Sequence, residues 1–201
     1  MVAKNIPLKD CAEVVPGFSA KGSLSDDPEG TVQVLTAQHL TPGEPYRYRD
    51  EHRLRIRPSR SLEKYLLVPG TILFMSRGAN NYAVLLEEFP QPAIAPLSFF
   101  IIKPKPDVFP AYLAWCLNQE PFQTELNAIR TGAGTPMIPR REFGEIIIPL
   151  PSMTRQKLMA TLADLQRREK DLLRQTVDAT NRLHRLMGMK LLSSNILDEQ
   201  E

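Results

Sequence analysis

The residues best suited to bind an anion are basic side chains clustered between positions 47 and 64. They are Arg47, Arg49, Arg53, Arg55, Arg57, Arg60 and Lys64. The alternation of residues 53–57 (RLRIR) predicts a strand with three guanidinium groups on one face and two apolar side chains on the other. Three like charges on one face repel each other unless an anion neutralises them. A phosphate backbone would do so, and one arginine could also contact a guanine edge. The alternative is an exposed hairpin that its charge keeps soluble.

A second polar group lies in a predicted turn, Arg77 to Asn81, between two apolar segments. Arg77 supplies a charge, and Asn80 and Asn81 supply amides that can pair with an adenine edge. Asparagine is also common in turns because it tolerates positive φ. This group therefore indicates either a nucleic-acid contact or a turn of ordinary chemistry.

A third group surrounds the small-residue segment 131–135 (TGAGT). Backbone amides of such a segment can contact phosphate, although it lacks the Lys-Ser/Thr of a nucleotide-binding loop and could equally be a flexible connector. The side chains that we assign to a candidate DNA contact here are Arg130, Thr131, Arg140 and Arg141. The arginines could instead cap helices or pair with nearby carboxylates.

Signals for catalysis are weak. His39, His52 and His184 are scattered, and none has the spacing to Cys, Asp or Glu that a zinc site requires. The chain has no G-x-S-x-G, H-E-x-x-H or Walker A motif. Two adjacent carboxylate pairs, 26–27 and 87–88, stand in polar surroundings typical of a solvated surface. The sequence predicts no catalytic centre, no metal and no cofactor, and a metal-dependent nuclease has only these pairs in its favour.

Length, composition and charge limit what these groups can do. The chain has 201 residues, 42 % of them hydrophobic, and a formal net charge of +2. This length allows one globular domain and an extension, and the small net charge means that an anion site must be a local patch. Cys11 and Cys116 are too far apart in sequence for a short metal-ligand pair. With no apolar signal segment at the start and no run long enough to span a membrane, the sequence predicts a reduced, cytoplasmic protein.

Hydrophobic patterning places these groups on a mixed α+β framework. Strands are predicted at 31–37, 53–57, 71–76, 82–86, 97–102 and 146–148, the last stopping at Pro149 and Pro151. A helix is predicted from Pro110, with a break at Pro121 and a second helix to about Ile129. We therefore expect a globular domain over 1–151 and a helical segment over 152–201.

The C-terminal segment has a different period. From Arg155 onward, apolar residues recur at alternating intervals of four and three, which is a heptad pattern. The seam leucines are Leu158, Leu162, Leu165, Leu172, Leu183 and Leu186, with Glu169, Thr176 and Ala179 as its weak centre. Residues 155–190 would form a helix of roughly 50 Å, too long for one domain of this size to cover. The pattern predicts a homodimer through paired helices, and the alternative is a helix folded back on its own domain.

Several short motifs together resemble a known family. In chain order they are Val34-Leu35-Thr36-Ala37, residues 66–74 (LLVPGTILF), Arg77-Gly78, residues 110–113 (PAYL), Thr131-Gly132 before Pro136, and residues 147–151 (IIPLP) with Gln156. Their order resembles the target-recognition domain and helical spacer of type I restriction–modification specificity (S) subunits. The resemblance covers essentially the whole chain.

The resemblance implies a function as well as a fold. S subunits typically hold two recognition domains and two spacer helices that pair antiparallel, whereas this chain has one of each, which implies a half-subunit that dimerises. It implies a non-catalytic protein that binds double-stranded DNA at a bipartite target. Methyltransferase (M) subunits, and in a full system a restriction (R) subunit, would be the partners and would bind S-adenosylmethionine and ATP. A stand-alone DNA-binding regulator and a protein-interaction module are the alternatives.

Overall fold

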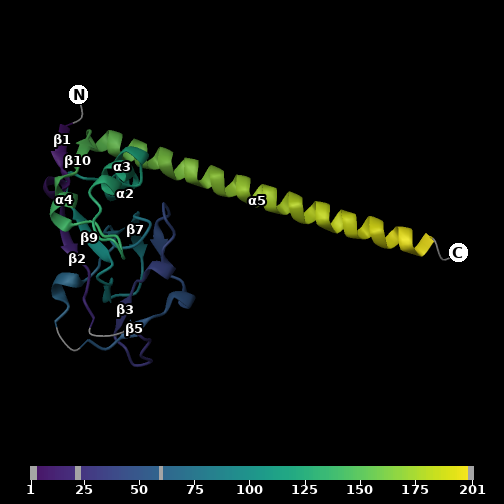
Figure 1. The fold of residues 1–201 in the computed structure, drawn as a ribbon, viewed down its shortest axis with the longest axis horizontal. Coiled ribbons are helices and arrows are strands. Elements are labelled where there is room, and N and C mark those ends of the chain that lie inside the picture. The colour runs from purple at the N-terminus through teal and green to yellow at the C-terminus, as the bar shows by residue number, and fades with distance from the viewer. Residues whose placement is uncertain (1–3, 21–23, 59–60, 199–201) are drawn as a thin grey trace. The chain divides into compact units, whose positions relative to one another are not determined.

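The computed structural model describes residues 4–20, 24–58 and 61–198, and for residues 193–198 it describes the backbone helix alone. The chain forms two compact units, Met1–Ala160 and Thr161–Glu201. The first unit contains the strands and short helices, and the second contains most of the long C-terminal helix (Figure 1). The α+β class predicted from the sequence is confirmed.

The first unit is built on a five-stranded sheet. Its strand order is β2 (Ala12–Pro16), β9 (Phe99–Pro104), β6 (Ile72–Met75), β7 (Ala83–Glu88) and β4 (Tyr46–Arg47). Neighbours run antiparallel except β4, which is parallel to β7. The central strands are apolar at consecutive positions because both faces of the sheet are covered. On β6, Ile72 and Phe74 enter one core cluster, and Leu73 and Met75 enter another.

Two smaller sheets complete the unit. β5 (Arg55–Ile56), β3 (Val32–Val34) and β8 (Ala93–Ile94) form a three-stranded sheet, in which β3 and β8 are parallel. β1 (Lys4–Pro7) and β10 (Ile147–Leu150) form an antiparallel pair that joins the two ends of the unit. Three short 3-10 turns, η1 (Ala37–His39), η2 (Asp50–His52) and η3 (Glu63–Tyr65), lie between the strands.

Short helices cover one face of the large sheet. They are α1 (Leu8–Cys11), α2 (Pro110–Leu117), α3 (Glu120–Ala128) and α4 (Arg140–Glu145). Phe143 of α4 lies with its ring centroid 4.5 Å from that of Phe74 and 5.2 Å from that of Phe100, and all three side chains are buried. Aromatic contacts of this kind supply much of the apolar area that holds helix and sheet together.

Most of the predicted elements are confirmed with shifted ends. The strands expected at 71–76, 82–86 and 97–102 are β6, β7 and β9, and the helix break before Pro121 is confirmed, with this proline in the first turn of α3. The strand expected over 31–37 ends at Val34. Thr36 instead caps η1, where its backbone N–H donates to His39 Nδ1 at 3.3 Å.

The prediction of a strand over 53–57 is wrong in length, since only Arg55 and Ile56 are extended partners of β3. The 3-10 turn η2 precedes this strand and ends in a C-cap at Arg53, whose N–H donates to Asp50 O at 3.1 Å. The strand expected to stop at Pro149 runs on to Leu150. A two-stranded ladder has an outer edge, where the missing N–H of proline costs no bond.

The long helix α5 (Met153–Asp198) begins at a buried polar joint in the first unit. Gln156 is 1 % exposed, and its amide makes three hydrogen bonds. The N–H of Phe109 donates to Oε1 at 2.7 Å, and Nε2 donates to the carbonyls of Asp107 (3.0 Å) and Pro151 (2.9 Å). These bonds connect the first turn of α5 to the loop before α2, so the start of the helix belongs to the folded domain.

Apolar packing completes this joint. Ala160 lies in a cluster with Tyr112 and Cys116 of α2, and the partly buried Trp115 and Met159 pack against it. The Tyr112 hydroxyl donates to the Pro149 carbonyl at 2.5 Å. Burial raises the pKa of the Cys116 thiol to about 11, as expected for a structural cysteine.

Candidate nucleic-acid interface

The arginine face predicted over 53–57 has carboxylate partners within the chain. The Arg57 guanidinium lies 2.6 Å from the Glu29 carboxylate and 3.6 Å from that of Asp27. The backbone N–H of Arg55 donates to Asp26 Oδ1 at 2.8 Å. Of the three guanidinium groups predicted for this face, that of Arg57 is therefore neutralised by carboxylates of the acidic segment before β3.

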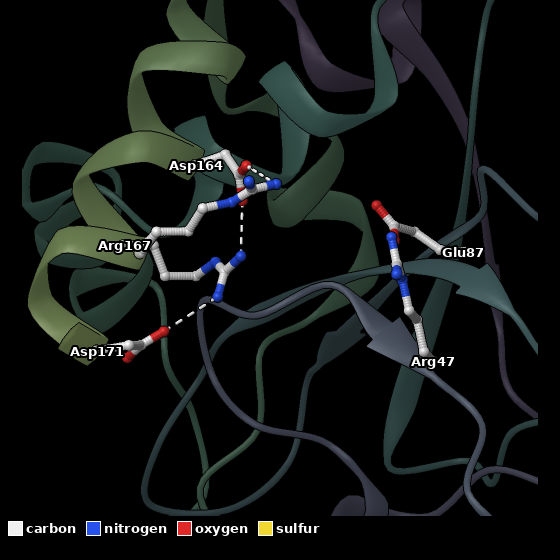
Figure 2. Close-up of polar contacts among 6 residues, drawn as sticks. Arg47, Glu87, Asp164, Arg167 and Asp171 are labelled. Carbon is white, nitrogen blue, oxygen red and sulfur yellow. Dashed lines mark hydrogen bonds and ion pairs between the residues drawn. The ribbon is translucent and has the colours of Figure 1, made fainter. Parts of the chain in front are cut away.

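Arg47, Arg49 and Arg53 occupy the segment that leads from β4 to η2. Arg47 Nε is 2.8 Å from Glu87 on β7 (Figure 2), and Arg49 is 3.7 Å from Glu51. Both arginine side chains are 72 % exposed. Exposed ion pairs contribute little stability, so these guanidinium groups can exchange a carboxylate for a phosphate at small cost. The Arg53 guanidinium donates to the Pro28 carbonyl at 3.2 Å.

A partly buried histidine–tyrosine cluster supports this segment. The His52 ring stacks on that of His39 (centroids 5.0 Å apart) and on that of Tyr46 (5.7 Å), and Tyr48 meets it edge-on. Burial, with a smaller contribution from His52, lowers the pKa of His39. Burial likewise raises the pKa of Tyr46 to about 12. The scattered positions of these residues gave no sign in the sequence that they meet.

The second and third predicted groups form one structure. The turn between β6 and β7 is joined to the loop after α3 by a backbone bridge between Arg77 and Met137. Gly78 N–H donates to Pro136 O and Ile138 N–H donates to Ser76 O, both at 2.8 Å. We call the two segments, 76–81 and 130–138, the stapled turn.

Arg130 is the side chain that fixes the stapled turn. Its Nη2 donates to the carbonyls of Gly78 (2.7 Å) and Ala79 (2.5 Å), and its Nη1 donates to Asn127 Oδ1 at 2.9 Å. Asn81 Nδ2 donates to Met75 O at 2.7 Å from within the turn. Both residues, predicted as DNA contacts, thus have hydrogen-bonding roles inside the protein.

Arg77 and Asn80 differ from these two residues. Both are exposed, and neither side chain has a hydrogen-bond or ion-pair partner within the part of the chain that the structure describes. Gly78 has φ +111, a conformation that an L side chain rarely adopts, so it permits the tight path between them. The stapled turn therefore presents the unengaged side chains of Arg77 and Asn80 on a braced backbone.

The remaining predicted side chains are spread over the first unit. Thr131 is exposed at the edge of the stapled turn, and its Oγ1 lies 3.4 Å from the Met137 carbonyl. Arg140 and Arg141 begin α4, where Arg140 donates to Val14 O at 3.3 Å and Arg141 is exposed. Arg60 lies outside the described residues. DNA contact by any of these side chains stays a prediction.

The basic groups lie at two ends of β7. The stapled turn precedes Ala83, whereas Arg47 pairs in register with Glu88 at the other end. Five residue steps along a strand span roughly 17 Å. The two groups are therefore separate sites of charge.

No group of three or more His, Cys, Asp or Glu side chains able to hold a metal occurs among the described residues. Of the predicted carboxylate pairs, Asp27 lies beside Arg57 and Glu87 beside Arg47. None of the described helices has the length and apolar content to cross a membrane.

The second unit carries the predicted seam on an amphipathic helix. Leu162, Leu165, Leu172, Leu183 and Leu186 are each 54–62 % exposed. At 3.6 residues per turn, most of the seam lies on one side of α5. Around the other side, Arg167 pairs with Asp164 at 2.7 Å and with Asp171 at 3.1 Å (Figure 2). Such ladders support the helix while its leucine face stays open.

Large apolar side chains near residue 190 extend beyond the seam. Leu186, Met187, Met189, Leu191 and Leu192 are 53–67 % exposed and lie at several angles about the axis, with Lys190 among them. One partner helix would cover the side that carries Leu186 and leave other sides open.

Comparison with known proteins finds solved structures of similar fold. No protein-family model matches the chain, and no curated protein matches its sequence. Among solved structures, a type I restriction–modification S subunit from M. genitalium is similar with a TM-score of 0.56 at 16 % identity, covering 84 % of this chain and 40 % of that one. The HsdS subunit from Thermoanaerobacter tengcongensis is similar with a TM-score of 0.62 at 14 % identity, covering 86 % and 39 %.

A third similar chain comes from a structure describing complex assembly and conformational transition of the type I restriction–modification system. Its TM-score is 0.66 at 16 % identity, and the match covers 91 % of this chain and 43 % of that one. This chain thus spans about two fifths of the length of the proteins it matches. At these identities the likeness establishes architecture. The chain has the fold of one half of a type I restriction–modification S subunit.

Proposed function

We propose that this protein is a DNA specificity half-subunit of a type I restriction–modification system, with no catalytic centre of its own. The observation that carries the proposal is the likeness to S subunits over 84–91 % of this chain but only about two fifths of theirs. One recognition domain with one long helix corresponds to half of that architecture. Two copies would restore the whole.

The open seam of α5 supports the homodimer. Six seam leucines, Leu158 included, are 54–67 % exposed, and such a face gains free energy when a second helix covers it. Polar or small residues at Glu169, Thr176 and Ala179 weaken its centre, which favours antiparallel pairing with leucine-rich ends opposed. A two-fold axis then presents two identical reading domains in opposite orientation.

The target is accordingly an inverted repeat interrupted by unread base pairs. A rigid helix pair fixes the separation of the half-sites, and each added base pair would also rotate one half-site about the duplex axis. In this proposal methyltransferase subunits, and a restriction subunit where one exists, bind the DNA-bound dimer and supply the chemistry. S-adenosylmethionine and ATP bind to those partners.

The test is selection of bound duplexes from a random DNA pool, using the unaltered chain and two variants. We expect an inverted repeat of one fixed spacing. Leu172→Glu places a charge in the seam and should abolish both dimerisation, measured by sedimentation, and the second half-site. Asn181→Glu introduces the same charge at an exposed position on the side of the helix opposite the seam and should change neither. A continuous asymmetric site, or half-sites at freely varying separation, would overturn the symmetric model.

Copurification separates this proposal from a stand-alone DNA-binding regulator, since only a specificity subunit should retain a DNA methyltransferase. Salt dependence separates it from a protein-interaction module, because DNA affinity falls steeply with added salt when phosphates are contacted. An affinity independent of salt would leave the arginines as solvated surface groups.

A further inference from the structure

We propose that the stapled turn is the element that reads base edges, with Arg77 and Asn80 as the reading side chains and Arg130 as a positioning residue that does not touch DNA. This inference rests on the proposed function and adds to it an assignment of roles among the candidate residues.

The first step is which side chains are available. Arg47, Arg49 and Arg57 each lie beside a carboxylate, at 2.8, 3.7 and 2.6 Å. Arg77 and Asn80 are exposed and have no partner among the described residues. Binding DNA through Arg77 and Asn80 therefore breaks no ion pair or hydrogen bond described within the protein.

The second step is rigidity. Base readout requires donors held in a fixed geometry, whereas phosphate contacts tolerate mobile side chains. The turn that carries Arg77 and Asn80 donates one backbone hydrogen bond to the 130–138 loop, accepts one from it, and accepts two more from Arg130. Apart from Thr131 on the same stapled turn, no other exposed candidate side chain among the described residues has bracing of this kind.

The third step is chemistry. Arginine forks onto the O6 and N7 acceptors of guanine, and asparagine pairs with N6 and N7 of adenine. These are the two side-chain types that the braced turn presents. The arginines around 47–57, at the other end of β7 or on the smaller sheet, would then make the phosphate contacts that set position and affinity.

Arg130 makes its contacts within the protein. Its guanidinium holds the carbonyls of Gly78 and Ala79 and the side chain of Asn127 at once, an arrangement that needs a planar fork. A lysine keeps the charge but cannot span these acceptors. Arg130→Lys therefore separates a positioning role from a charge role.

The experiment is random-pool selection followed by affinity titration in varying salt, using the unaltered full-length chain, Arg77→Ala, Asn80→Ala and Arg130→Lys. Lys105→Ala is the charge control, because Lys105 is exposed and outside the candidate groups. Arg77→Ala should lose preference for guanine at one position of each half-site, by roughly 5- to 150-fold, and keep its preferences elsewhere. Asn80→Ala should do the same at an adenine.

Arg130→Lys should weaken the base preference at the positions read by both Arg77 and Asn80, while leaving the slope of affinity against salt unchanged. Lys105→Ala should alter neither specificity nor slope. Uniform weakening on all sequences by Arg77→Ala would make Arg77 a phosphate contact and overturn the inference, as would unchanged specificity in either alanine variant. Unchanged specificity in Arg130→Lys would overturn its positioning role. Failure of the unaltered chain to bind any duplex would instead overturn the proposed function, and this inference with it.

Discussion

Replacing Gln156 by methionine should destabilise the first unit by about 2–4 kcal/mol. Methionine has a similar unbranched shape, so the cavity change is small, but it can neither accept from Phe109 N–H nor donate to the carbonyls of Asp107 and Pro151. Each net hydrogen bond is worth roughly 0.5–1.5 kcal/mol, and an unsatisfied buried donor costs about 1–3 kcal/mol. Because Gln156 is 1 % exposed, water cannot readily replace the lost partners.

The measurement is urea unfolding followed by tryptophan fluorescence. Trp115 is the single tryptophan of the chain and packs against the same cluster as Ala160, so its emission reports on this joint. We expect the unfolding midpoint to fall with an unchanged m-value. Gln123→Met is the matched control, because this half-buried side chain makes one hydrogen bond, to Leu117 O at 2.6 Å, and should cost about 1 kcal/mol or less.

Two shortened chains extend the same test. A chain ending at Ala160 retains Gln156 and the packing around it, and should unfold at nearly the same urea concentration as the first unit of the intact protein. A chain ending at Pro151 lacks the joint and should be less stable than Gln156→Met. A loss of under 0.5 kcal/mol for Gln156→Met, or equal stability of the two shortened chains, would refute the reasoning.

Two further predictions follow from ionisable groups in the first unit. The pKa of His39 is lowered in the folded state by burial and by His52. The stability that the neutral His39 contributes is therefore fully present above the ordinary histidine pKa of about 6.5 and is lost as pH falls through the lowered pKa. The free energy of unfolding, measured between pH 7.5 and 5, should fall less for His39→Gln than for the unaltered chain. Burial raises the pKa values of Cys11 and Cys116 to about 11, so both thiols should resist labelling at pH 8 until the protein unfolds, and rapid labelling of the native protein would contradict their placement.

Sequence patterning located the elements whose signal is local. Consecutive apolar residues marked β6 and β9, and prolines at 110 and 121 marked the starts of α2 and α3. Heptad spacing marked α5. The short strands β4 and β8, of two residues each, left no such signal because their pairing depends on distant partners.

The sequence predicted which residues belong to the candidate site, but not how they lie relative to one another in space. Arg77 and Arg130 were assigned to separate groups, because nothing in one sequence signals that Arg130 spans to the carbonyls of Gly78 and Ala79. The charge pattern of 53–57 was visible, whereas the carboxylates that face it come from a segment more than 20 residues earlier. Side-chain pairing over such separations depends on the tertiary fold.

Under the proposed function, the placement of the basic groups would let the domain change its target without losing its fold. The core is formed by β6, β7 and β9, packed on both faces, and by the Gln156 joint. The stapled turn and the arginine segment at 47–53 lie at the ends of these strands and contribute few buried apolar side chains. Substitutions there alter the presented donors and acceptors with little effect on the core. The α5 seam, in the second unit, is likewise unaffected, so in the proposed dimer the separation of two half-sites and the bases read in each would vary independently.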